Sequence, residues 1–294
     1  MRYMKSLLTR RFSPPLIKGG QGGFTPQKSP ARLARRPLLL NGAKGFTLVE
    51  LVVVIVLLGI TAVTFTTLIT GSVRGYLDTA NRQDSAAIAR IALDRIARDL
   101  REAMPQSVRV TNDHSCLQFL PVVASTVYTA FAADFTSVTV MDFAAPNGGG
   151  YYAAVYPINS DELYGTTAMK PISDFGTMSN NLRTITLASG FPAPRNSPGE
   201  RLYVVSGSPV SYCFTNAQLI RYTSAISTTQ PTPGAGLNNG AMLIDKLIAP
   251  TTFTYGLGNW QNNALVTIAL TLQQAGSNNE KLQFDHEVWL RNVQ

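Results

Sequence analysis

The sequence predicts an α+β protein in which one long, hydrophobic N-terminal helix packs on a mainly antiparallel β-sheet head. An apolar run from Phe46 to Ile69 contains one charged residue, Glu50. Residues 74–104 continue this run with apolar residues at helical spacing. After Pro105 the pattern changes to short apolar segments bounded by Gly, Pro, Asn and Ser. The predicted parts are a leader at 1–45, the helix at 46–104 and the head at 105–294.

The leader carries the net positive charge of the chain. The chain as a whole has a formal net charge of +8. Residues 1–45 contain ten basic residues and no acidic residue, namely Arg2, Lys5, Arg10, Arg11, Lys18, Lys28, Arg32, Arg35, Arg36 and Lys44. The other 249 residues hold 15 basic and 17 acidic residues, a net charge of −2. Without the leader, charge gives no indication of nucleic-acid binding. Basic residues before an apolar run stay on the cytoplasmic side, so we expect the head outside the cytoplasm.

Residues 46–73 are long enough to span a bilayer, which takes about 20 apolar residues. Glu50 is unusual there, because a charge at the bilayer centre costs about 2.5–3.5 kcal/mol even on lenient scales. Such an acid needs a cationic partner. The nearest candidate is a new amino terminus at Phe46, formed by a cut after Gly45.

Residues 74–104 are predicted to be the amphipathic part of the helix. Apolar residues recur at helical spacing at Leu77, Ala80, Ile88, Ile91, Leu100 and Met104. Opposite charges four residues apart, such as Arg95 and Asp99, are expected on the solvated face. Pro105 is expected to end the helix.

The head is predicted to consist of short strands and two long loops. The predicted strands are Ser115–Val123, Phe135–Phe143, Leu182–Ala188, Arg201–Ser206, Val210–Thr215 and Gln218–Thr223. A final hairpin pairs residues 266–272 with 282–290 through a loop at 274–279, since apolar and polar residues alternate along both segments. Residues 144–181 and 226–241 are predicted to be loops.

The stretch Lys44-Gly45-Phe46-Thr47-Leu48-Val49-Glu50 resembles the processing site of type IV prepilins and type II secretion pseudopilins. The resemblance implies that a prepilin peptidase cuts between Gly45 and Phe46 and N-methylates Phe46. It implies that Glu50, at the fifth mature position, sets the register by pairing with the Phe46 ammonium of a neighbouring subunit. The helix then anchors the chain in the bacterial inner membrane, with the head in the periplasm, before the chain joins other pilins or pseudopilins at the cell surface.

Other segments are similar to minor pilins of the mannose-sensitive haemagglutinin (MSHA) pilus biogenesis group, the MshO kind. They are 76–82, 95–101 and 284–293. The absence of proline from 46–73, the long leader and the large head also favour a minor pilin. The resemblance implies a role in pilus assembly, in filament initiation or at the tip. Two alternatives stay open, a minor pseudopilin of type II secretion and a tip adhesin or DNA-uptake pilin.

The two cysteines, Cys116 and Cys213, both follow the apolar run. A disulfide is plausible outside the cytoplasm, and two buried free thiols are the alternative. The segments around both cysteines also resemble the MSHA group, which favours the disulfide.

No other motif indicates catalysis. His286 and Glu287 are neighbours on a predicted strand, so their side chains point to opposite faces and cannot chelate one metal. Asp161 and Glu162 are expected to be a solvated loop pair. No phosphate-binding or dinucleotide fingerprint occurs. We therefore predict no enzymatic activity, no cofactor and no metal site.

Overall fold

The computed structural model describes residues 45–104, 106–192, 195, 197–258, 263–273 and 280–290. The leader up to Lys44 and the hairpin loop predicted at 274–279 lie outside these residues. The chain divides into two units, Met1–Thr61 and Ala62–Gln294. The described part of the first unit is Gly45–Thr61, and it is almost entirely helical. All described strands belong to the second unit.

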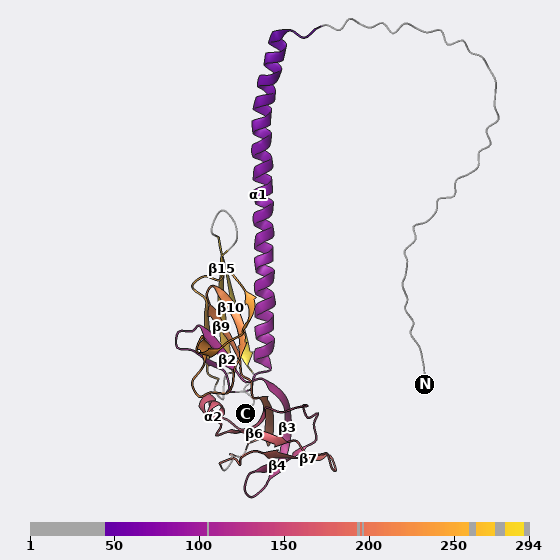
Figure 1. Ribbon diagram of the computed structural model, residues 1–294, viewed down its shortest axis with the longest axis vertical. Coiled ribbons are helices and arrows are strands. Elements are labelled where there is room, and N and C mark those ends of the chain that lie inside the picture. Colours follow the sequence, from indigo (N-terminus) through magenta and orange to yellow (C-terminus); the bar gives the residue numbers. More distant parts are fainter. Residues whose placement is uncertain are drawn as a thin grey trace, which may run out of the picture. The chain divides into compact units, whose positions relative to one another are not determined.

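Helix α1 runs from Leu48 to Arg101, 54 residues without a break (Figure 1). It contains no proline, so no backbone N–H is missing from its hydrogen-bond ladder. The helix ends three residues before the predicted end because residues 102–104 pair with residues 120–122. The N–H of Met104 donates to the carbonyl of Leu120 (2.7 Å), and the N–H of Val122 donates to the carbonyl of Glu102 (2.9 Å).

The buried face of α1 differs from the predicted one. Its buried residues recur at helical spacing and are Ala89, Ala92, Leu93, Ile96, Ala97 and Leu100. The prediction was correct for Leu100 and Met104, which are both buried, and wrong for Leu77, Ile88 and Ile91, whose exposed fractions are 51%, 44% and 70%. Three of the six buried residues are alanines, and these small side chains let the helix lie close to the strands. The predicted set contained none of these three alanines, so it missed most of the buried face.

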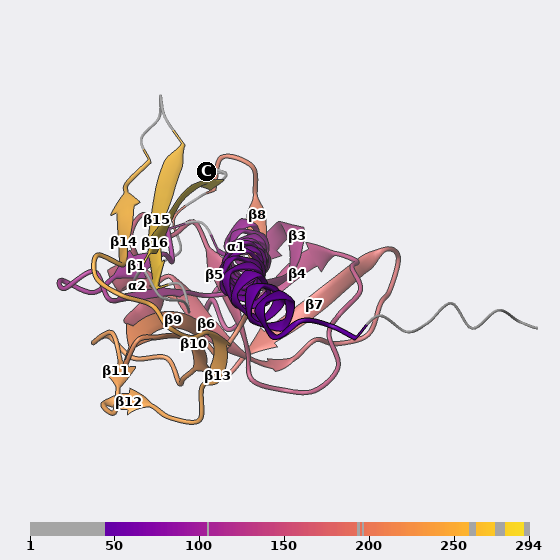
Figure 2. The ribbon, with the colours of Figure 1, turned by 90° about the horizontal axis from the view of Figure 1, so that it is seen from above.

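Eight strands surround the buried face of α1. The first sheet has the antiparallel order β1-β2-β9-β10-β13. Its strands are β1 (Arg109–Val110), β2 (Cys116–Phe119), β9 (Val210–Thr215), β10 (Gln218–Thr223) and β13 (Ala241–Ile244). The second sheet, β14-β15-β16, consists of Thr252–Gly256, Ala264–Gln273 and Lys281–Leu290. Figure 2 shows the two sheets as separate groups of strands. Their apolar side chains and those of α1 form one core.

Apart from these two sheets, the strands β3 to β8 form a closed barrel in the order β3-β4-β7-β6-β5-β8. This barrel was not predicted from the sequence. Its elements are β3 (Val122–Phe131), β4 (Ser137–Met141), β5 (Tyr151–Val155), α2 (Ser160–Tyr164), β6 (Met169–Asp174), β7 (Leu182–Leu187) and β8 (Arg201–Ser206). The barrel has a separate core that includes Tyr128, Val140, Ile185 and Leu202.

Two predictions about this region were wrong. The predicted strand Ser115–Val123 is two strands, β2 and β3, interrupted at Leu120 and Pro121. Proline has no N–H to donate to a strand ladder, and here the chain passes from the sheet to the barrel. The predicted loop at 144–181 contains β5, α2 and β6. The predicted loop at 226–241 is largely irregular and contains two short strands, β11 (Thr232–Pro233) and β12 (Gly236–Leu237).

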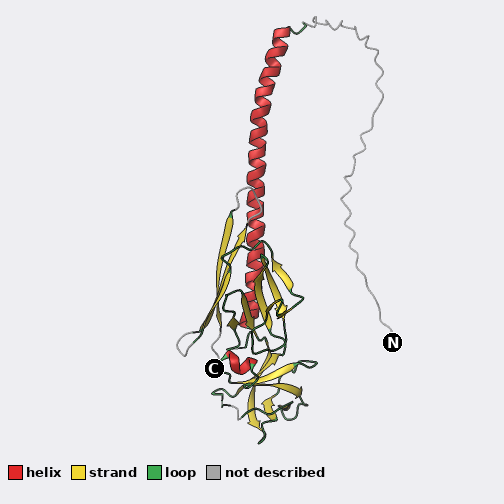
Figure 3. Ribbon diagram, turned by 60° about the vertical axis from the view of Figure 1, so that its left-hand side comes forward, coloured by secondary structure: helices red, strands yellow, loops and turns green. Residues whose placement is uncertain are grey.

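The barrel is an insertion between β2 and β9, two neighbouring strands of the five-stranded sheet. Figures 1 and 3 show two groups of strands with α2 at their junction. A small apolar cluster joins the groups and includes Met104, Leu120, Leu163 and Tyr164. The Tyr164 hydroxyl donates to the carbonyl of Ser107 (3.1 Å). The second unit is therefore an α+β head in which a barrel is added to a helix-and-sheet core.

Candidate functional site

The candidate cleavage bond, Gly45–Phe46, lies immediately before α1. Residues 45–47 are not helical, and the exposed fraction of Phe46 is 80%. A Cβ added to Gly45 would meet no atom within 4 Å. A peptidase needs an accessible backbone, and Gly45 and Phe46, on the two sides of this bond, are both exposed.

Thr47 caps the helix. Its side-chain oxygen accepts a hydrogen bond from the N–H of Glu50 (3.2 Å), and its carbonyl accepts from the N–H of Leu51 (3.2 Å). The first bond satisfies a backbone donor that has no partner within the helix, and the second is the first regular hydrogen bond of the helix. This role was not predicted from the sequence, although Thr-x-x-Glu is the signature of a helix-capping box.

Glu50 lies in the first turn of α1 and is exposed. A carboxylate there is favoured by the positive end of the helix dipole, by about 0.3–1 kcal/mol at an exposed site. Glu50 therefore has a stabilising role within its own chain, apart from any pairing between subunits. In the uncut chain the nitrogen of Phe46 belongs to a peptide bond, so the predicted ammonium partner forms only after cleavage. The pairing stays a prediction.

The first half of α1 has an apolar surface without a protein partner among the described residues. Every residue from Gly45 to Leu77 is exposed. By length and composition α1 qualifies as a candidate membrane span, and none of its most apolar 18-residue stretch is buried. This fits anchoring in a membrane.

The hydroxyl groups in this part of α1 bond to the helix itself. Thr66 donates to the carbonyl of Ala62 (2.7 Å), Thr70 to that of Thr66 (2.9 Å) and Ser72 to that of Leu68 (2.9 Å). Such bonds satisfy polar side chains without water. The hydroxyl residues therefore do not prevent this segment from lying in a lipid or protein environment.

Cys116 and Cys213 form a disulfide. They are directly opposite each other on the neighbouring strands β2 and β9, and both are fully buried. The pairing implied by the resemblance is confirmed, and the alternative of two free thiols is excluded. The cross-link joins the two strands between which the barrel is inserted.

The two histidines and the acidic pair Asp161 and Glu162 lie in three different elements of the head. His114 lies in a turn, where its Nδ1 is 3.0 Å from the carbonyl oxygen of Phe253, and His286 is opposite Ile268 on β16. Asp161 and Glu162 lie in α2, so the prediction of a loop was wrong there; Asp161 is exposed, as predicted, whereas Glu162 is half-buried. Among the described residues, no group of three or more His, Cys, Asp or Glu side chains has the geometry for a metal ion.

Glu162 has a structural role in this region. Its carboxylate accepts hydrogen bonds from Arg195 (2.8 Å) and from the N–H of Ile158 (3.1 Å). The hydrogen bond from Arg195 is the main reason why the pKa of Glu162 lies below its usual value.

Comparison with known proteins identifies one feature, and it coincides with the exposed start of α1. Residues 40–66 match the model of a family described as the prokaryotic N-terminal methylation motif. No curated protein and no solved structure matches the chain. The motif, the apolar helix that follows it and the antiparallel β head together support a type IV prepilin-like protein.

Proposed function

We propose that the chain is a minor type IV pilin of the MSHA type. Prepilin peptidase cuts it between Gly45 and Phe46 and methylates the new amino terminus. The mature chain, residues 46–294, then joins other pilins through α1. The observation that carries the proposal is the methylation motif at an accessible, non-helical bond directly before an exposed apolar helix.

Two features of the fold support a minor rather than a major subunit. No proline bends α1, whereas the major pilins that the motif resembles carry one in this segment. The head carries an inserted barrel, residues 122–206, in addition to its helix-and-sheet core. A subunit with this extra volume is easier to place at the end of a thin filament than at every position along it, so we place it in initiation or at the tip.

Mass spectrometry of the N-terminal peptide of the mature protein tests the processing step. The expected peptide begins with N-methyl-Phe46. The matched variant Gly45→Val should remain uncut, because a Cβ at this position meets no atom of the described residues within 4 Å and the branched side chain therefore obstructs only the peptidase. A mature terminus at any other residue, or normal cutting of Gly45→Val, would contradict the proposal.

The same processing would occur in a minor pseudopilin of type II secretion. Deletion of the gene distinguishes a type IV pilus subunit from a type II secretion subunit. Loss of pili with intact protein secretion supports the assignment as a pilin. Loss of secretion with intact pili supports the pseudopilin. A tip adhesin is the third candidate, and the separate barrel favours it because a folded module can present a binding surface apart from the filament-forming helix.

A further inference from the structure

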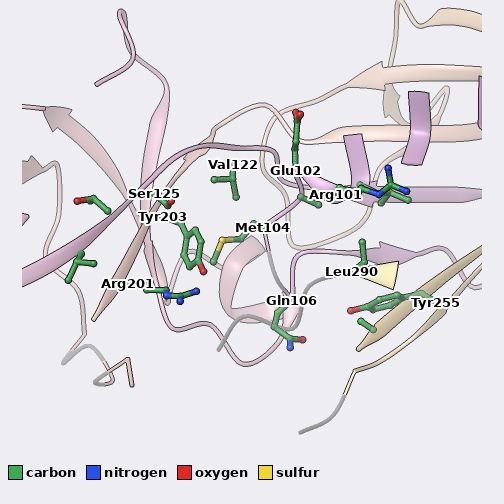
Figure 4. A pocket seen from close by; sticks show the side chains of 15 residues that line it. Arg101, Glu102, Met104, Gln106, Val122, Ser125, Arg201, Tyr203, Tyr255 and Leu290 are labelled. Atoms are coloured by element: carbon green, nitrogen blue, oxygen red, sulfur yellow. The ribbon is translucent and has the colours of Figure 1, made fainter. Parts of the chain in front are cut away.

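A cleft of about 470 Å³ lies where α1 ends, between the barrel and the three-stranded sheet. Figure 4 shows Arg201 and Tyr203 on one side, Tyr255 and Leu290 on the other, and Met104 between them. The volume falls within the range of about 300–1,000 Å³ that is usual for ligand sites. All the lining residues belong to the second unit.

The cleft combines an apolar lining with polar side chains that have no partner among the described residues. Met104 and Leu290 are buried, and Val122 and Ala264 add further apolar surface. Within the described part of the chain, the side chains of Arg101, Arg201, Tyr203 and Tyr255 form no hydrogen bond or ion pair. The Tyr255 hydroxyl group is a neutral donor at physiological pH, and burial raises its pKa further above that range.

Arg201 differs from every other described arginine of the head. Each of the others has a side-chain partner: Arg109 bonds to Gln118, Arg183 to Asp142, Arg195 to Glu162 and Arg221 to Asp99. Arg201 lines the cleft, as does Arg101 from the end of α1. Two arginines from distant parts of the sequence thus line one cleft from different sides (Figure 4), and neither side chain has a carboxylate partner among the described residues.

We propose that this cleft binds a short peptide segment of a partner protein that carries a carboxylate side chain between apolar residues. Guanidinium groups form charge-assisted hydrogen bonds with carboxylates. The apolar lining accepts the flanking side chains, and the tyrosine hydroxyl groups and the Gln106 amide suit the peptide carbonyls. A sugar acid would leave the apolar lining uncovered. A phosphate dianion would be repelled by Glu102 on the same rim more strongly than a carboxylate.

Retention of defined peptides on the immobilised, detergent-solubilised full chain tests the proposal. One pool contains capped pentapeptides with Glu at the centre and Leu, Ile, Val or Phe around it, and the matched pool has Gln at the centre. We expect the chain to retain the Glu pool about tenfold more than the Gln pool. This preference should disappear in the double variant Arg101→Gln/Arg201→Gln and persist in Arg90→Gln, which changes an exposed arginine of the same helix.

The proposal would be overturned by equal retention of the two pools by the wild type, by an unchanged preference in the double variant, or by loss of the preference in Arg90→Gln. Displacement of the Glu pool by inorganic phosphate or by N-acetylneuraminic acid at equal concentration would also overturn it, since the cleft would then be a general anion or glycan site. Far-UV circular dichroism confirms that each variant is folded. The test does not involve cleavage at Gly45, so its failure leaves the proposed function untouched.

Discussion

Removal of the Cys116–Cys213 disulfide should lower the free energy of unfolding by an amount that depends on how the head unfolds. The two cysteines are 97 residues apart in the sequence, and the barrel lies within the loop that they close. In the chain-entropy model, closing a loop of this length stabilises the folded state by about 4.7 kcal/mol. This value holds only if the barrel unfolds together with the sheets.

If the barrel stayed folded while the sheets unfolded, the flexible part of the loop would be much shorter. It would comprise residues 117–121 and 207–212, and the same model then gives about 3 kcal/mol. The contacts at the junction favour the larger value. The guanidinium group of Arg109 lies 3.5 Å from the ring centre of Tyr164, and the Tyr164 hydroxyl donates to the carbonyl of Ser107. These contacts join the barrel to the core, so we expect a single transition.

Urea denaturation of the full chain in detergent, followed by circular dichroism, measures the effect. The oxidised wild type is compared with the reduced wild type, which keeps both side chains, and with Cys116→Ala/Cys213→Ala. We expect a loss of about 4–5 kcal/mol on reduction and no effect of reductant on the double variant. A loss below about 1 kcal/mol would refute the loop-closure reasoning. Two separate transitions would refute the expected coupling of barrel and sheets.

The other predictions concern α1 and its contacts. Ile96→Ala should destabilise the head by about 2–5 kcal/mol because Ile96 is fully buried. The control Ile91→Ala, at an exposed position of the same helix, should change stability by less than about 0.5 kcal/mol in the same assay. Equal losses would show that the face of α1 described as buried is wrong. The pKa of Tyr212 is raised by burial and, to a smaller extent, by the hydrogen bond that its hydroxyl group donates to Asp99. The stabilisation of the folded state by the protonated Tyr212 is therefore complete below the unfolded-state pKa of about 10 and is lost as pH rises further. Tyr212→Phe should therefore reduce the fall in stability above pH 10, and an unchanged slope would argue against this assignment. Glu50→Ala should leave cleavage intact but reduce incorporation into filaments several-fold, measured as the mature protein in sheared pili and in membranes; normal incorporation would eliminate the pairing role.

The sequence was sufficient for the features that depend on local pattern. The apolar run, the antiparallel hairpin of β15 and β16, and strands β8, β9 and β10 follow from spacing and alternation, and those three strands have the predicted bounds. The start of α1 was predicted within two residues. Its cap at Thr47 was overlooked, although the spacing to Glu50 indicates it.

The features that were not predicted depend on contacts between distant parts of the chain. The barrel closes by pairing β3 with β8, and residues 151–155 and 169–174 become strands because β8 and β7 lie beside them. The partners of Asp99 are Arg221 and Tyr212, more than 100 positions away, rather than the neighbouring Arg95. The cleft at the end of α1 is also formed by segments that are far apart in the sequence. The local periodicity of apolar residues in the sequence carries no information about such contacts.

The insertion of the barrel between two cross-linked neighbouring strands determines how mechanical load passes through the head. When α1 is held and the barrel is pulled, tension leaves the helix at Arg101 and reaches Cys116 through residues 102–115. There the disulfide connects this path directly to Cys213 and hence to both ends of the barrel. The strands that follow Cys213, from β10 to β16, lie outside the covalent path between the two points of force. They complete the core around α1 while the short segment before Cys116 transmits the pull.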